Sequence, residues 1–315
     1  MKRIGLVLAV LLATTGLVFA AGGQERTRDG YMVGYVCNNF NDTFQTYVMD
    51  AARDYFVEVD DVSITFQDAQ EDVIRQQDLV NTFITQGVDA LIVVPVDTSA
   101  MTPIIRAASE ANVPLIFVNR NPFGDETPPE NVYYVGSQEI VAGRMQMEEM
   151  GKLLGGEGGV AILMGRLDNE GAILRTEGNE EVVAEKFPNI RVLAKETGLW
   201  QRDQGMSLTE NWITAYGDRL NGILSNNDEM ALGAAEALRS AGRTDVPVMG
   251  VDAIPDALEA VRQGILAATV LQDSVGQGGG SARLAHRILK GESVEQVTWV
   301  PFVLINQDNL DQFID

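Results

Sequence analysis

Short apolar runs alternate with longer amphipathic segments along the chain after residue 29. The apolar runs predict buried parallel strands, and the segments whose apolar residues recur every third or fourth position predict helices. The predicted strands cover residues 31–37, 62–67, 90–94, 113–118, 131–135, 159–164, 190–196, 222–225, 246–252, 267–271 and 298–305. The predicted helices cover residues 43–57, 73–86, 141–154, 172–187, 203–216 and 274–289. Two more helices are predicted, one that begins at Pro103 and one that ends at Ala241. This alternation is typical of an α/β fold with helices on both faces of a parallel sheet.

The alternation is interrupted at residues 121–130, which contain three prolines and a glycine. On either side, residues 87–119 and 220–252 share one pattern of strand, polar turn, helix, Val-Pro, strand and polar end. We therefore predict two doubly wound parallel-sheet lobes joined by a multi-strand hinge. Residues 30–119 and 273–298 are assigned to an N-terminal lobe, and residues 120–272 and 299–315 to a C-terminal lobe.

Polar side chains follow the predicted strands of the second half. They are Asn226, Asn227, Asp228, Asp252, Gln272 and Asp273. In open α/β sheets, ligands bind outside the carboxyl ends of the strands. Amides and carboxylates at that edge, without a metal-binding set or a nucleophile, favour a neutral ligand rich in hydroxyl groups.

The first twenty residues have the features of a signal peptide. Lys2 and Arg3 precede an apolar stretch over residues 4–19, and Val18-Phe19-Ala20 resembles a cleavage site. A membrane anchor is the alternative, but the stretch is short and contains two glycines. We predict export, with the mature protein in the periplasm.

Composition narrows the choice of partners. The 315 residues are 45% apolar, which suffices for a packed core. Loss of Lys2 and Arg3 would change the net charge from −22 to −24, since two positive charges leave with them. Such a charge argues against nucleic acid and anionic membranes as partners. Cys37, the only cysteine, cannot form an internal disulfide and is expected to be a buried small hydrophobic residue.

Several motifs together indicate a known family. They are Ser225-Asn-Asn-Asp-Glu-Met-Ala-Leu-Gly, Val246-Pro-Val-Met-Gly-Val-Asp-Ala-Ile-Pro, Ala268-Thr-Val-Leu-Gln-Asp and Tyr133-Tyr-Val-Gly. The chain resembles the periplasmic monosaccharide-binding proteins of ABC importers, most closely the galactose/glucose-binding type. The resemblance implies a periplasmic binding protein type I fold, a monomer whose lobes close on a sugar, and delivery to the permease subunits. A chemoreceptor is a further candidate partner.

The resemblance also implies the residues that hold the sugar. Asp42 and Asp252 would accept hydrogen bonds from hydroxyls, and Phe44 and Trp200 would stack on the two faces of the ring. The other implied contacts are Arg175, Asn227 and Gln272, together with Arg120, which matches the ribose-binding type, and Asn169, which replaces a histidine. Two alternatives stay open: the aromatic rings could be core residues, and Asp252 could cap the helix that begins near Pro255.

Three positions depart from the galactose/glucose pattern. Val94 stands where an asparagine is expected, Gly171 where an aspartate is expected, and Asn169 where a histidine is expected. Galactose or glucose is the leading prediction, and ribose, xylose or inositol are alternatives. The calcium loop of that type is replaced by the glycine-rich residues 153–159, so we predict no metal site there.

Two other functional classes fit the sequence less well. An enzyme would need a catalytic group, yet His286 lies in a predicted helix as a surface residue, and neither Asp42 nor Asp252 has an evident reason for a raised pKa. A sugar-responsive transcriptional regulator would need a basic DNA-binding segment at its N-terminus, where this chain has the predicted signal peptide. We therefore predict a binding protein that is not an enzyme and that uses no cofactor.

Overall fold

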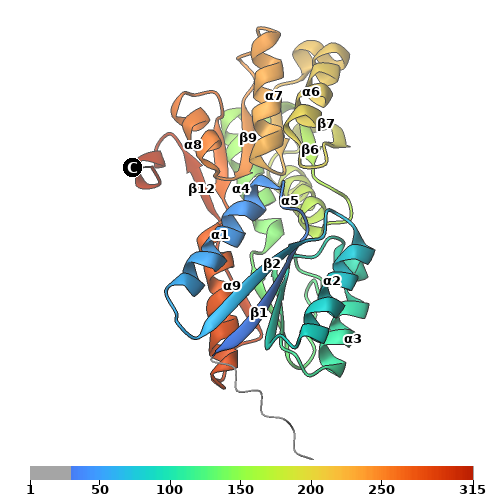
Figure 1. The fold of residues 1–315 in the computed structure, drawn as a ribbon. Helices are drawn as coiled ribbons and strands as arrows, with labels where there is room; N and C mark the ends of the chain where they lie inside the picture. Colours follow the sequence, from blue (N-terminus) through green and yellow to red (C-terminus); the bar gives the residue numbers. More distant parts are fainter. Residues whose placement is uncertain (1–29, 315) are drawn as a thin grey trace, which may run out of the picture.

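A computed structural model describes residues 30–314, and the predicted signal peptide lies outside this part of the chain. The described residues form two α/β lobes, one above the other in Figure 1. The sheet of the N-terminal lobe has the order β11-β5-β4-β3-β1-β2, and all its pairs are parallel. Its strands are β1 (Tyr31–Cys37), β2 (Val62–Asp68), β3 (Ala90–Val93), β4 (Leu115–Asn119), β5 (Val132–Gly136) and β11 (Val297–Trp299).

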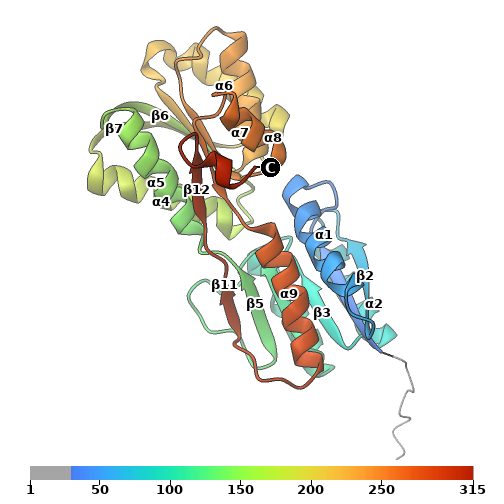
Figure 2. The ribbon, with the colours of Figure 1, turned by 90° about the vertical axis from the view of Figure 1, so that its left-hand side faces the viewer.

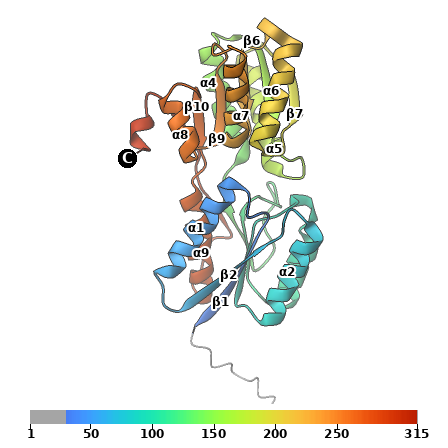
Figure 3. The same cartoon turned by 45° about the horizontal axis from the view of Figure 1, so that its top comes forward.

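Helices cover both faces of this sheet. They are α1 (Thr43–Val57) and α9 (Ser274–Leu289) on one face, and α2 (Val73–Gln86) and α3 (Thr102–Glu110) on the other. Figure 3 shows α2 and α9 on opposite sides of β1 and β2. Successive strand residues therefore enter different cores: Tyr35 packs under α1 and Val36 under α2. Burial on both faces explains why the strands are continuously apolar. Cys37 is buried in the first of these cores, as expected.

The C-terminal lobe repeats this architecture. Its sheet has the order β12-β10-β9-β8-β6-β7, in which only the β10–β12 pair is antiparallel. The strands are β6 (Glu157–Met164), β7 (Asn189–Thr197), β8 (Gly222–Ser225), β9 (Val248–Asp252), β10 (Ala268–Leu271) and β12 (Val303–Asn306). The helices are α4 (Glu139–Leu153), α5 (Glu170–Lys186), α6 (Arg202–Tyr216), α7 (Asp228–Ser240) and α8 (Pro255–Arg262). Short 3₁₀ turns occupy Thr98–Ala100, Gly217–Arg219 and Leu310–Gln312. The predicted fold class, two parallel-sheet α/β lobes, is confirmed.

The predicted lobe boundary after residue 119 differs from the structure. β5 pairs with β4 in the first sheet, so the proline-rich connection returns to the same lobe and the chain crosses only after Gly136. The predicted last strand over residues 298–305 is also two strands, β11 and β12, in different sheets. Figure 2 shows β11 in the lower lobe and β12 in the upper lobe. Within residues 30–314 the chain therefore crosses between lobes three times: after β5, after β10 and after β11.

Candidate functional site

A cleft separates the lobes where the carboxyl ends of both sheets face each other. Its outer part has a volume of about 270 Å³, and a narrower inner part has a volume of about 40 Å³. Both parts are lined by Asp42, Phe44, Trp200, Asn227 and Asp252, so they form one continuous cleft. Placement at this edge of a doubly wound sheet is the usual position for a ligand.

All nine residues predicted as ligand contacts line the inner cleft. They are Asp42, Phe44, Arg120, Asn169, Arg175, Trp200, Asn227, Asp252 and Gln272. Gln45 and Asn119, which the sequence interpretation did not include among them, complete the lining. The inner cleft is thus built from both lobes, with most of its residues at strand ends or at the first positions of helices.

Three of the predicted residues are helix N-caps. Asp42 Oδ1 accepts from the backbone N–H of Gln45 at 3.2 Å, at the start of α1. Asn169 caps α5, and Asn227 Oδ1 accepts from the Met230 N–H at 3.1 Å to cap α7. The positive ends of three helix dipoles therefore point toward the cleft, where they favour electron-rich ligand atoms.

Arg120 is fixed on the N-terminal side of the cleft. It is 2% exposed, and its Nη1 donates to the carbonyl oxygens of Pro95 at 2.9 Å and Val96 at 3.2 Å. Its Nη2 lies 3.7 Å from Asp42 Oδ2, which neutralises part of the buried positive charge. Val94, the first departure from the galactose/glucose pattern, is fully buried in the apolar core and does not line the cleft.

Arg175 is fixed on the opposite side. Its Nε donates to Glu139 Oε2 at 2.6 Å, and its Nη2 donates to Gln272 Oε1 at 2.6 Å. Its Nη1 donates to the Asn226 carbonyl oxygen at 2.5 Å. The guanidinium carbon also lies 5.8 Å from the ring centroid of Trp200 and 5.8 Å from that of Phe302. Arg175 therefore organises this side of the cleft, with one N–H left on each Nη atom.

Asp252 is a buried carboxylate for which no hydrogen bond is found in the described part of the chain. Its nearest positive group is Arg175 Nη1, at 4.0 Å. Burial raises the pKa of Asp252 well above its usual value, and the nearby Arg175 opposes this only in part. The expectation that Asp252 has no reason for a raised pKa is thus wrong, because the sequence did not reveal how deeply the end of β9 is buried. Asp252 does not cap α8 either, since that helix has no side-chain cap bond.

Asp228 supports the turn that presents Asp252. Asp252 has φ 123° and Ala253 has φ 57°, both in the left-handed region, which non-glycine residues rarely adopt. The buried Asp228 carboxylate accepts from the Ile254 N–H at 3.0 Å and from Thr269 Oγ1 at 2.7 Å. These bonds hold the turn against β10. Asp228 is therefore a supporting residue of the site and does not line the cleft.

Trp200 is also held by an unusual backbone conformation. Leu199 has φ 58° and Trp200 has φ 69°, and the Trp200 carbonyl accepts from Asn227 Nδ2 at 3.2 Å. The indole lies against Gly165, where an added β-carbon would be 2.0 Å from Trp200 Cζ2. The ring both packs on the core of the C-terminal lobe and lines the cleft, so Trp200 is partly a core residue, and its stacking on a ligand stays a prediction. The same is true of Phe44 in the N-terminal lobe.

Four buried polar atoms around the inner cleft have no hydrogen-bond partner among the described residues. Three are donors, Arg120 Nε, Trp200 Nε1 and Gln272 Nε2, and one is an acceptor, Gln45 Oε1. Buried polar atoms in native proteins are nearly always paired. Together with the carboxylates of Asp42 and Asp252, these atoms form a lining that suits a ligand able both to donate and to accept hydrogen bonds.

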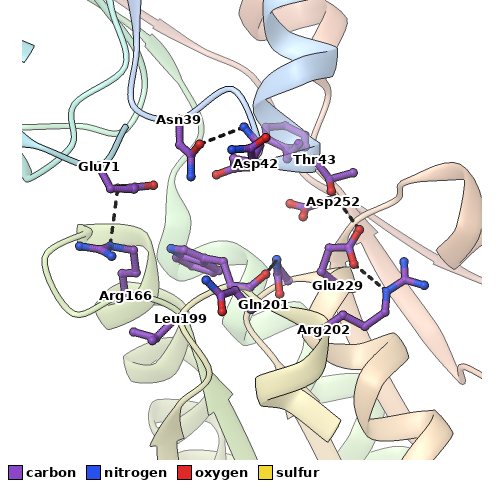
Figure 4. A pocket seen from close by; sticks show the side chains of 14 residues that line it. Asn39, Asp42, Thr43, Glu71, Arg166, Leu199, Gln201, Arg202, Glu229 and Asp252 are labelled. Carbon is purple, nitrogen blue, oxygen red and sulfur yellow. Dashed lines mark hydrogen bonds and ion pairs between the residues drawn. The ribbon is translucent and has the colours of Figure 1, made fainter. Parts of the chain in front are cut away.

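The lobes also touch each other around the mouth of the cleft (Figure 4). Thr43 Oγ1 donates to Glu229 Oε1 at 3.0 Å, and Arg166 Nε lies 3.6 Å from Glu71 Oε2. On another side, the Thr98 N–H donates to the Asp168 carbonyl oxygen at 3.2 Å. The lobes are therefore in a closed arrangement that limits access to the inner cleft.

Glu170 makes a further contact between the lobes and predicts a pH dependence. Its Oε1 accepts from the Asn121 N–H at 2.7 Å, and its Oε2 is buried without a partner. Burial, followed by the charge of Glu139, raises the pKa of Glu170 to about 8. An unfolded glutamate has a pKa of about 4.3. Between these values the folded state binds more protons, so we expect the free energy of unfolding to fall as pH rises from 5 to 8.

Thermal unfolding measured across this range, with the Glu170→Gln variant beside the wild type, checks this expectation. The variant keeps the acceptor for Asn121 but does not titrate, so its melting temperature should depend less steeply on pH. Glu177→Gln is the matched control, because Glu177 is an exposed residue of the same helix. Parallel pH profiles for wild type and Glu170→Gln would show that Glu170 does not titrate in this range.

Comparison with known proteins gives the family. The sequence model of the family described as "Periplasmic binding protein domain" matches residues 33–293. The chain belongs to this family. A protein of Rhizobium meliloti named "Putative rhizopine-binding protein" is 39% identical over 98% of this chain and 97% of its own length. The xylitol-binding protein of Mycolicibacterium smegmatis is 37% identical over 100% of this chain and 88% of its own length.

A solved structure supports the same family and fold. It is an ABC transporter solute binding protein of Bacillus halodurans with bound myo-inositol, 37% identical to this chain, with a TM-score of 0.84. The alignment covers 91% of this chain and 98% of that one. Membership of the periplasmic binding protein family and the two-lobed fold, both predicted from the sequence, are therefore confirmed. Within residues 30–314, no helix has the length and apolar content of a membrane span.

The predicted closeness to the galactose/glucose type is wrong. The D-galactose/methyl-galactoside binding periplasmic protein of Haemophilus influenzae is only 28% identical, well below the relatives above. The shared motifs that suggested this closeness include the turns after β8 and β9. In these turns Asp252 lines the cleft and Asp228 supports it. Such features are common to a binding architecture and are not specific to one sugar.

Proposed function

We propose that this periplasmic binding protein captures a neutral polyol, with myo-inositol or a related cyclitol as the favoured ligand, and delivers it to an ABC permease. The observation that carries the proposal is the set of unpaired donors and acceptors around the inner cleft. A ring that carries a hydroxyl on each carbon can donate to Asp42 and Asp252 and accept from Arg120 and Gln272. Its C–H faces can pack between Phe44 and Trp200.

The preference for a cyclitol over galactose or glucose has two supports. Three positions depart from the galactose/glucose pattern, and an unmatched hydroxyl in a buried site costs about 1–3 kcal/mol, so the departures act against those hexoses. In addition, the relatives above that share 37–39% identity bear names that refer to rhizopine, xylitol and myo-inositol. A hexose or pentose stays in the test as an alternative ligand.

The proposed mechanism is closure around a hinge. Three chain crossings join the lobes, and each lobe contributes part of the inner cleft. A ligand that contacts both lobes binds only the closed form tightly, so it shifts the population toward that form. The closed form is then what the permease recognises. The proposal includes a monomer in the periplasm with no catalytic role, and a chemoreceptor as a second partner.

A ligand screen tests the proposal directly. Binding to the folded state alone raises the free energy of unfolding by about 2.7 kcal/mol at a ligand concentration of 100 times Kd. We expect myo-inositol to raise the melting temperature more than xylitol, D-ribose, D-galactose or D-glucose, with titration calorimetry as confirmation. No shift with any of these compounds would contradict the proposed function, and a larger shift with galactose would restore the hexose alternative.

Substitutions in the cleft give a second test. Trp200→Ala removes a stacking face and Asp252→Ala removes a carboxylate acceptor, so each is expected to weaken polyol binding about tenfold or more, equivalent to about 1.4 kcal/mol. Trp299→Ala is the matched control, because Trp299 is 46% exposed on β11 and does not line the cleft. Titrations of Trp200→Ala and Asp252→Ala that match the wild type would remove both residues from the site.

A further inference from the structure

We propose that Gln45 determines ligand specificity: its side-chain oxygen accepts a hydrogen bond from one ligand hydroxyl, and a buried chain of amides holds it in that orientation. This inference rests on the proposed function, since it concerns the same cleft. It adds residues that neither the sequence patterns nor the resemblance indicated. We call the chain formed by Gln45, Asn119, Gln277 and Ser137 the amide relay.

The amide relay is continuous and well formed. Nε2 of Gln45 donates to Oδ1 of Asn119 at 2.7 Å. Nδ2 of Asn119 donates to Oε1 of Gln277 at 3.0 Å, and Nε2 of Gln277 donates to the Ser137 hydroxyl oxygen at 3.0 Å. All four side chains are buried, with exposed fractions between 0% and 7%. Each bond is therefore protected from competition with water.

Separate elements hold the members of the relay in place. Gln45 lies in the first turn of α1, Asn119 ends β4 with φ 67°, and Gln277 lies in α9. The two helices touch closely next to Gln277, because an added β-carbon at Gly278 would lie 2.0 Å from the Val48 carbonyl oxygen. This contact fixes the distance between α1 and α9, and with it the distance that the relay spans.

The relay decides which atom of Gln45 is available to a ligand. Its Nε2 is committed to Asn119, and its Oε1 has no partner among the described residues although Gln45 is only 2% exposed. Gln45 also lines the inner cleft. Rotation of the Gln45 amide alone by 180° would place its NH₂ group in the cleft but would oppose two oxygens, Gln45 Oε1 and Asn119 Oδ1. To reverse Gln45 without losing a hydrogen bond, the amides of Asn119 and Gln277 would have to turn with it. The relay therefore presents an acceptor to the ligand.

An acceptor at this position selects for ligands with a matching hydroxyl. A ligand without it would bury Oε1 unpaired, and sites built to hydrogen-bond a hydroxyl discriminate strongly against analogues that lack it. The relay also ends at Ser137, which lies between β5 and α4, in the first crossing between the lobes. Gln277 is a positioning residue, because it belongs to the relay and does not line the cleft.

Calorimetric titration with myo-inositol and with deoxy-inositols that each lack one hydroxyl tests the inference. For the wild type, we expect one deoxy-inositol to lose about tenfold or more in affinity through the missing contact to Gln45. Gln45→Met, which keeps the size of the side chain but replaces the amide oxygen with a weakly accepting sulfur, should bind myo-inositol about tenfold more weakly. This variant should no longer distinguish that deoxy-inositol from myo-inositol, a change that a purely structural role of Gln45 would not produce.

Gln277→Met tests the relay itself. It should reduce both the affinity for myo-inositol and the discrimination, and the double variant with Gln45→Met should lose less than the sum of the two single losses, because the residues act in one network. Ser281→Ala is the matched control: Ser281 is a buried polar residue of α9 whose hydroxyl, among residues 30–314, bonds only to the Gly278 carbonyl oxygen of its own helix. Its titrations should match the wild type.

The outcomes separate this inference from the proposed function. If the wild type binds no inositol, both are overturned. If it binds myo-inositol but all deoxy-inositols bind equally well, or if Gln45→Met keeps the selectivity of the wild type, only the role of Gln45 is overturned. If Gln45→Met loses selectivity while the titrations of Gln277→Met match those of Ser281→Ala, the amide relay does not orient the side chain of Gln45.

Discussion

Replacement of Arg175 with methionine is expected to lower the free energy of unfolding by about 3–5 kcal/mol, the range observed when one partner of a buried ion pair is removed. The methionine fills a similar volume, but Glu139 keeps a buried charge without its 2.6 Å partner. Gln272 and the Asn226 carbonyl also lose the donors that hold them. Urea unfolding with linear extrapolation measures the loss, and ligand binding should disappear with it.

A double variant separates the causes of this loss. In Glu139→Gln/Arg175→Met the uncompensated charge of Glu139 is gone, although Asp252 still lacks its nearest positive group. We therefore expect the free energy of unfolding to recover by about half of the loss, as buried ion pairs can be replaced by neutral groups. Ligand binding should stay weak, because Gln272 is still unsupported. If Arg175→Met unfolds like the wild type, the ion pair with Glu139 does not stabilise the protein.

Gly165→Ala is expected to weaken ligand binding by about tenfold or more, comparable to the loss in Trp200→Ala. The added methyl would lie 2.0 Å from Trp200 Cζ2, far inside contact distance, so the indole must leave its position against Gly165. The backbone of Leu199 and Trp200 is already in the left-handed region, which leaves little room for adjustment. Titration with myo-inositol or another bound polyol measures the loss, and near-ultraviolet circular dichroism reports the displaced ring.

Gly279→Ala is the control for this substitution. Gly279 lies in α9, and the nearest atom to an added β-carbon is the Ala51 carbonyl oxygen at an ordinary 3.7 Å. This variant should bind as the wild type does and should be slightly more stable, since alanine favours helix over glycine by about 1 kcal/mol. Unchanged binding in Gly165→Ala would mean that the position of the Trp200 ring does not matter to the ligand.

The sequence interpretation identified the lining of the cleft well because of the geometry of parallel sheets. Residues that directly follow strands, such as Asn227 and Asp252, are brought to one edge of the sheet whatever the details of packing. Asp42 and Asn169 could be located for a related reason, since a helix that follows a strand begins at the same edge. The roles of these residues as caps add to their proposed roles in binding.

Gln45, Glu139 and Phe302 could not be identified in the same way. Gln45 follows Phe44 in an amphipathic helix, where its burial and its bond to Asn119 depend on how α1 meets α9 and β4. Glu139 lies just before the helix that the sequence predicts over residues 141–154, and only the contact with Arg175 of α5 makes it a buried ion-pair partner. Phe302 lies in a crossing segment that was interpreted as part of one long strand.

The amino-acid sequence by itself determined the α/β class, the repeated pattern of two lobes and the polar residues at the strand ends, because periodicity and strand direction are local properties. Only the tertiary structure decided which sheet receives β5, β11 and β12, since the partner of a strand depends on contacts between residues far apart in the chain. It also decided the burial that raises the pKa of Asp252, and the orientation of Gln45. Both follow from contacts between segments far apart in the chain, and no single segment of the sequence contains that information.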